Sequence, residues 1–319
     1  MLNKKNIFLC MFVVISLFLI TNVIALTISI DYPLNTTYNF DINSLNYTHD
    51  GATSCWYSAN GAVKNVSQLI ASYTTGDWIY SSPYVSNGYV YIGSNDNKLY
   101  QLNATNVSQL IASYTTGDWI YSSPYVSNGY VYVGSYDNKL YQLNATNVSQ
   151  LIASYATGWS VYSSPYVSNG YVYVGSLDNK LYQLNATNVS QLVASYTTGD
   201  NIYSSPYVSN GYVYIGSTDN KLYQLNATNV SQLVASYTTG DNIYSSPYVS
   251  NGYVYVGSFD NKLYQLNATN VSQFIASYET GDNIYSSPYV KDGYVYVSSS
   301  DDKLYQLNAT NVSQLVASY

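Results

Sequence analysis

One sequence of 41 residues recurs along most of the chain with almost no change. Its copies begin at Asn65, Asn106, Asn147, Asn188, Asn229 and Asn270, and a seventh start at Asn311 runs to Tyr319. A fixed period of this length is typical of repeat proteins, in which each copy is one structural unit that packs on its neighbours. The repeat therefore predicts one large array over residues 65–319.

Each copy contains the pattern of four short strands. Across the first copy and the start of the second, we expect one set of four strands over residues 82–85, 89–93, 98–102 and 108–114. The clearest is the run Tyr-Val-Tyr-Ile at 89–92, where Tyr alternates with β-branched residues, a period of two that fits a strand and not a helix. Four strands in 41 residues match the size of a propeller blade, whereas leucine-rich and two-helix repeats would show other spacings.

Turn residues separate these strands. Asn87 and Gly88 predict a two-residue hairpin, because both tolerate the positive φ of a type I′ turn. Asp96 and Asn97 mark the second turn, and residues 103–106 mark the third.

The first 64 residues differ from the repeat. Lys4 and Lys5 precede an apolar run over 7–20, which predicts a signal peptide of residues 1–25 and a secreted or cell-surface protein. The alternative is an uncleaved anchor, in which case the chain would contact a membrane. Residues 26–64 predict short strands over 27–32, 44–48 and 54–58. This segment resembles the opening of an immunoglobulin-like module of archaeal surface proteins; as an alternative, which we favour, it forms with residues 65–73 a divergent seventh blade.

Composition excludes several classes of function. The chain has 17 acidic and 10 basic residues, a formal net charge of −7, and none of the basic residues is Arg. Nucleic-acid binding needs clustered Lys and Arg, so we predict no nucleic-acid partner. The only two cysteines are Cys10, inside the signal segment, and Cys55, so the mature chain cannot form an internal disulfide.

The repeat resembles a known family. Ser123-Pro124, the sequence YVYVGS at 130–135, Asp137-Asn138 and Leu143-Asn144-Ala145 are similar to the PQQ-like β-propeller repeat of quinoprotein dehydrogenases, outer-membrane assembly lipoproteins and archaeal surface proteins. The resemblance covers residues 80–319. It implies an all-β propeller of four-stranded blades, with six clear repeats and the divergent seventh blade.

The chain departs from the enzymes of that family. The resemblance implies a blade-docking Trp where this chain has Ala, at Ala71, Ala112, Ala153, Ala194, Ala235 and Ala276. The enzymes also resemble one another in adjacent cysteines, a Ca²⁺ carboxylate cluster and a catalytic Asp, which this chain cannot match with one His (His49) and one Glu (Glu279). The turn Asp96-Asn97-Lys98 offers too few oxygens for Ca²⁺. We therefore predict no catalysis, no cofactor and no metal.

Two sets of positions point to surfaces. The copies differ mainly at two positions, and the large side chains there form a candidate binding rim for a protein or glycan: Trp78, Trp119, Tyr136, Leu177 and Phe259. In antiparallel blades the second turn and the interblade link lie at one end, so these residues should share one face. Alternatively, turns simply tolerate variation.

The third turn of each copy carries two N-glycosylation sequons. The candidate acceptors are Asn103, Asn106, Asn144, Asn147, Asn185, Asn188, Asn226, Asn229, Asn267 and Asn270, all expected on the opposite face. Alternatively, these asparagines only form turns.

Taken alone, the sequence predicts a non-catalytic secreted or cell-surface propeller that binds a protein or glycan. Two alternatives stay open: a scaffold subunit of an envelope protein-assembly complex, and a relict quinoprotein without cofactor. The last copy departs from the others at Lys291, Asp292, Ser298 and Asp302, and we expect these polar residues to protect an exposed edge.

Overall fold

The computed structural model describes residues 26–30, 36–40, 56–59, 62–65 and 69–319, which fall into two units divided after Ser72. In the first unit, β1 (Leu26–Ile30) pairs antiparallel with β2 (Thr36–Phe40), and β3 (Trp56–Ala59) pairs with β4 (Ala62–Asn65). These described strands form two separate two-stranded sheets, so the seventh blade stays a prediction. The predicted signal peptide 1–25, the expected strand 44–48, His49 and Cys55 lie outside the described residues.

The second unit contains six four-stranded antiparallel sheets in chain order, which confirms the six predicted blades. The first blade consists of β5 (Tyr84–Ser86), β6 (Tyr89–Gly93), β7 (Lys98–Asn103) and β8 (Asn106–Thr115). The second and third are β9 (Tyr125–Ser127), β10 (Tyr130–Ser135), β11 (Lys139–Asn144), β12 (Asn147–Ala156), and β13 (Tyr166–Ser168), β14 (Tyr171–Gly175), β15 (Lys180–Asn185), β16 (Asn188–Thr197). The fourth is β17 (Tyr207–Ser209), β18 (Tyr212–Gly216), β19 (Lys221–Asn226), β20 (Asn229–Thr238). The last two are β21 (Tyr248–Ser250), β22 (Tyr253–Gly257), β23 (Lys262–Asn267), β24 (Phe274–Glu279), and β25 (Tyr289–Lys291), β26 (Tyr294–Ser299), β27 (Lys303–Asn308), β28 (Leu315–Ser318).

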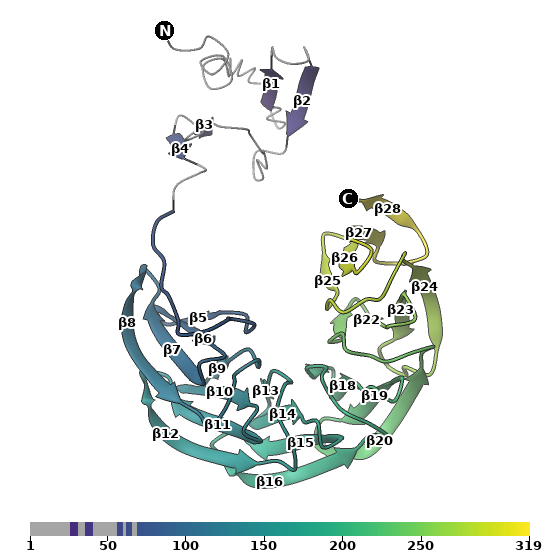
Figure 1. Ribbon diagram of the computed structural model, residues 1–319. Helices are drawn as coiled ribbons and strands as arrows, with labels where there is room; N and C mark the ends of the chain where they lie inside the picture. The colour runs from purple at the N-terminus through teal and green to yellow at the C-terminus, as the bar shows by residue number, and fades with distance from the viewer. Residues whose placement is uncertain (1–25, 31–35, 41–55, 60–61, 66–68) are drawn as a thin grey trace. The chain divides into compact units, whose positions relative to one another are not determined.

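The six blades follow one another around an arc. Figure 1 shows the long fourth strands, such as β8, β12 and β16, on the outside and the short first strands on the inside. The first blade and the last blade form the two ends of this arc. Each blade is therefore one radial sheet. Its first and third turns lie on one face of the arc, and its second turn and the link between blades lie on the other.

The local structure follows the turn chemistry. Asn87 and Gly88 have φ of 49° and 81°, which confirms the predicted type I′ hairpin, and Asn97 in the second turn has φ of 69°. The outer strand is longer than predicted, because it already begins at Asn106, which faces Asn103 across the third turn. A β-bulge near Leu102 lets this strand keep pairing as far as Thr115.

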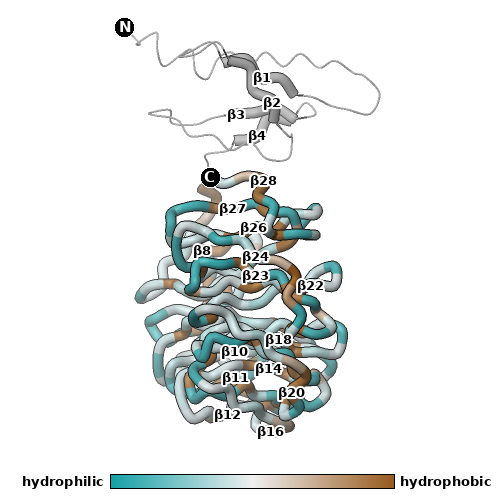
Figure 2. The backbone as a smooth tube through the Cα atoms, turned by 90° about the vertical axis from the view of Figure 1, so that its right-hand side faces the viewer, coloured by the Kyte–Doolittle hydropathy of each residue, from teal (hydrophilic) through white to brown (hydrophobic). Residues whose placement is uncertain are grey.

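The hydrophobic core lies between the blades. One cluster joins Tyr91 and Leu99 of the first blade to Val131, Val133 and others of the second, and four similar clusters join the later blades. In Figure 2 the hydrophobic residues lie mainly along the strands and hydrophilic ones occupy the turns. Each blade is stabilised mainly by its neighbours, as in other repeat arrays.

Buried polar groups set the position of each blade on the next. The Tyr91 hydroxyl and Gln101 Nε2 both donate to the carbonyl oxygen of Ala145 in the second blade, at 2.5 and 3.0 Å. The amide oxygen of Gln101 accepts from the Val148 N–H at 3.1 Å. The same Tyr and Gln make these contacts at all five interfaces.

A glycine in each of the first five blades lets the next blade approach. A Cβ built on Gly93 would lie 2.2 Å from Cγ2 of Ile120, in the link to the second blade. The corresponding distances at Gly134, Gly175, Gly216 and Gly257 are 2.2 to 2.4 Å. The last copy has Ser298 at this position, and Ser298 is exposed. Leu304 beside it is 50% exposed, whereas the equivalent Leu99 is fully buried. The last blade thus presents an open face to which Ser298 contributes.

Candidate binding face

The predicted arrangement of the turns is confirmed by backbone hydrogen bonds. In the second blade the N–H of Tyr136, in the second turn, donates to the carbonyl of Trp119, in the link, at 2.8 Å, and each copy has an equivalent bond. At the other end, the N–H of Ala104 in the third turn donates to the carbonyl of Gly88 in the first turn at 2.9 Å. We call the end with links and second turns the link face and the other the sequon face.

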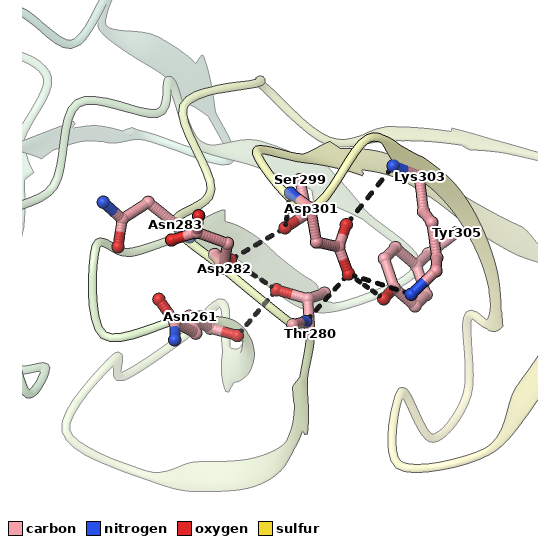
Figure 3. Close-up of polar contacts among 9 residues, drawn as sticks. Asn261, Thr280, Asp282, Asn283, Ser299, Asp301, Lys303 and Tyr305 are labelled. Carbon is pink, nitrogen blue, oxygen red and sulfur yellow. Dashed lines mark hydrogen bonds and ion pairs between the residues drawn. The ribbon is translucent and has the colours of Figure 1, made fainter.

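An aspartate in the second turn holds each link in place. In the last blade, Asp301 Oδ2 accepts from the Gly281 N–H at 2.9 Å and from the Tyr305 hydroxyl at 2.5 Å, while Ser299 donates to the carbonyl of Asp282 (Figure 3). The Thr280 hydroxyl contacts the carbonyl of Asn261 in the preceding blade at 2.9 Å. Asp301 thus joins the second turn to the link, which is a structural role.

The charge states of this pair are fixed around neutral pH. Burial would by itself raise the pKa of Asp301, but hydrogen bonds from Tyr305 and the Gly281 N–H, with the charge of Lys303, lower it to about 2. Burial and the hydrogen bond to Asp301 raise the pKa of Tyr305 to about 12. Neither group titrates near neutral pH, so the pair suits a structural clamp better than acid–base chemistry.

A ladder of tyrosines runs along the links. Successive ring centroids lie 4.9 to 5.6 Å apart in the series Tyr80, Tyr121, Tyr162, Tyr203, Tyr244 and Tyr285. A second ladder, at the first residue of each inner strand, has spacings of 5.3 to 5.7 Å and comprises Tyr84, Tyr125, Tyr166, Tyr207, Tyr248 and Tyr289. Packing between rings at these distances is favourable, so both ladders also hold neighbouring blades together.

Four of the five predicted rim residues join the first ladder. Trp78 lies 6.0 Å from Tyr80, and Trp119 lies 6.1 Å from both Tyr121 and Tyr136. Phe259 packs 4.4 Å from the ring of Tyr244. The copies thus differ at residues that share one aromatic surface, although they are far apart in the sequence.

The exposed part of this surface is uneven. Trp78 and Trp119 are 69% and 44% exposed, whereas Tyr136 and Phe259 are half-buried. Burial, followed by the neighbouring tyrosines, raises the pKa of Tyr136 to about 12. The remaining rim residue, Leu177, is half-buried and is bonded through its N–H to Ser160.

Trp159 is a member of this face that the sequence reasoning missed. It is 62% exposed and follows Gly158 in the link, where the other copies have Asp. The break in the repeat at this position was the signal that could have found it. Trp78, Trp119 and Trp159 give the links into the first three blades one exposed Trp each, while the later links carry Asn201, Asn242 and Asn283.

The described residues contain no group of three or more His, Cys, Asp or Glu side chains placed to hold a metal ion. Among the same residues, no helix is long and apolar enough to span a membrane. The candidate glycosylation asparagines all lie on the sequon face. Each ends a third strand or begins a fourth one, except Asn270, which lies in the turn before β24.

Comparison with known proteins places the chain in a family. The family model described as outer membrane protein assembly factor BamB matches residues 53–151 and 153–239, more than half of the chain. The chain belongs to this family. The BamB-family chain also resembles the crystal structure of BamB from Moraxella catarrhalis, with a TM-score of 0.66, 15% identity and 75% coverage of each chain.

A second solved structure of similar fold is the computationally designed protein Ika8, with a TM-score of 0.66 and 13% identity over 92% of this chain and 83% of that one. At such low identity both structures support the propeller fold alone. No curated protein sequence matches the chain significantly.

Proposed function

We propose that this BamB-family chain is a non-catalytic propeller scaffold of the cell envelope or cell surface that binds a protein partner through the link face of its first three blades. The observation that carries the proposal is the set of three exposed tryptophans in the links, Trp78, Trp119 and Trp159, of which the first two pack beside the tyrosine ladder. Trp is the residue most enriched where interfaces concentrate their binding energy, and three on one face are rare on a surface without a partner.

The family supports a protein partner in preference to a glycan. The family is that of an outer membrane protein assembly factor, which acts with other proteins, and a protein-assembly scaffold needs no catalytic groups. The proposal includes no cofactor, and titration of the purified chain with PQQ and Ca²⁺ tests that part. Uptake of either would favour a quinoprotein function instead.

The repeat supplies its own variants for testing the face. Trp78→Asn and Trp119→Asn introduce the residue that later copies have at the same position, and Trp159→Asp introduces the link Asp of the second copy, Asp118. A matched control changes Asn201, Asn242 and Asn283 to Ser, the residue of the third copy. All six changes should leave the fold intact, because another blade already carries each residue.

Binding is measured with the full chain as bait for envelope proteins from its source, followed by titration with the purified partner. A buried Trp at the centre of an interface contributes about 2 kcal/mol, so the triple Trp variant should weaken Kd by at least roughly 30-fold, and the control by less than about threefold. Equal binding by the Trp variant and the control would refute the link face as the site. If the chain bound specific sugars on a glycan array and no protein, the proposal of a protein partner would be refuted.

A further inference from the structure

The third turn of each blade contains two overlapping candidates for one modification. In the first blade these are the sequons Asn103-Ala104-Thr105 and Asn106-Val107-Ser108. Asn103 ends β7, Asn106 begins β8, and the two residues face each other across the turn. Facing residues of an antiparallel pair have Cβ atoms only about 5 Å apart, so two oligosaccharides cannot occupy one turn comfortably.

The hydroxyl contact of a sequon is present in both. Asn103 Oδ1 accepts hydrogen bonds from the N–H and the hydroxyl of Thr105, at 2.9 and 2.8 Å. Asn106 Oδ1 accepts from the same groups of Ser108, at 3.2 and 2.7 Å. The acceptor oxygen therefore does not distinguish the two asparagines.

The amide nitrogens do distinguish them. Asn103 Nδ2 donates to Gln109 Oε1 at 3.0 Å, and this bond recurs in all six copies. Throughout residues 69–319, no hydrogen bond engages Nδ2 of Asn106 or of its equivalents. The nitrogen that must attack a sugar is thus held by Gln109 in the first sequon and free in the second.

We propose that the folded chain accepts N-linked glycans at the second sequon of each turn in preference to the first. The acceptors are Asn106, Asn147, Asn188, Asn229, Asn270 and Asn311. The donor is a lipid-linked pyrophosphate oligosaccharide. The bond between its sugar C1 and the phosphate oxygen breaks, C1 bonds to Nδ2, one Nδ2 proton passes to a carboxylate of the transferase, and the lipid pyrophosphate leaves.

This assignment puts one glycan at most on each blade, all on the sequon face. The exposed tryptophans lie on the link face, so the glycans would leave the proposed protein-binding surface uncovered. The inference shares with the proposed function only an extracytoplasmic location, and it is tested without any protein partner.

The test uses the full chain purified unmodified from a host without N-glycosylation. It is incubated with a purified single-subunit oligosaccharyltransferase and its lipid-linked donor. A lysine precedes the third turn of every blade, so trypsin releases each third turn with both sequons on a peptide of distinct sequence. These lysines are Lys98, Lys139, Lys180, Lys221, Lys262 and Lys303. Electron-transfer fragmentation then assigns the sugar to one Asn or the other.

In the folded chain, occupancy at Asn106 should exceed that at Asn103 by about fivefold, the ratio that one neutral hydrogen bond supports. The free peptide of residues 99–139 should lose this preference. Gln109 is exposed, so Gln109→Ala should release Asn103 without unfolding the blade and raise its occupancy, while Ser108→Ala should abolish modification at Asn106. Equal occupancy in the folded chain, preference for Asn103, absence of transfer, or no effect of Gln109→Ala would each overturn the proposal.

Discussion

Replacing a glycine at a blade interface by the serine of the last copy tests how the array is held together. Gly175 lies at the centre of the array, and a Cβ built on it would lie 2.2 Å from Cγ2 and 3.0 Å from Cβ of Ile202, which is fully buried. Real Cβ atoms do not approach this closely, so Gly175→Ser forces the third and fourth blades apart or Ile202 out of its rotamer. Overpacking of this kind costs about 1–3 kcal/mol, and a contact this short should give the upper part of that range.

The last copy provides the matched control. Ser298→Gly removes the same hydroxymethyl group where no following blade packs, and it should change the free energy of unfolding by less than about 1 kcal/mol, the effect of glycine on chain entropy. The assay is urea unfolding of the full chain followed by circular dichroism, with the midpoint and slope compared among the variants. A Gly175→Ser effect no larger than that of Ser298→Gly would refute the close-approach reasoning.

Two further perturbations address buried groups. Gln183→Ala should destabilise the chain by about 2–3 kcal/mol in the same assay, because it leaves the Ala227 carbonyl and the Val230 N–H without this partner inside a packed interface; an effect under about 0.5 kcal/mol would contradict this. High pH should also unfold the array, because burial raises the pKa of Tyr91 and Tyr305 to about 12, above the ordinary value of 10. A tyrosine whose pKa is raised in the folded state stabilises the fold below pH 10, and this contribution is lost as the pH rises to about 12. The urea midpoint should therefore fall between pH 10 and about 12, while absorbance at 295 nm reports formation of the phenolates. A midpoint that does not change over this range would argue against buried phenols.

The face of the molecule that each turn occupies was predictable from the chain alone. Asn87-Gly88 could form only a tight turn with positive φ, and four antiparallel strands then fix which turns share an end. The position of Trp78 and Trp119 on one face followed from this alternation of turns between the two ends of a blade. Their contact with the tyrosine ladder did not, because the ladder joins residues one repeat apart that are identical in every copy.

The sequence by itself determined the period, the four strands of each blade, the turns and the division into two faces, because these depend on residues close together in the chain. The tertiary structure alone decided the contacts between blades: the close approach at Gly93, the bonds from Tyr91 and Gln101 to a carbonyl some 50 residues away, and the exposure of Ser298 at one end. It also decided that Gln109 holds one sequon and leaves the other free. The physical reason is that nearly identical copies have the same local preferences, so only packing against a neighbour, or the lack of one, makes the same residue buried in one blade and exposed in another.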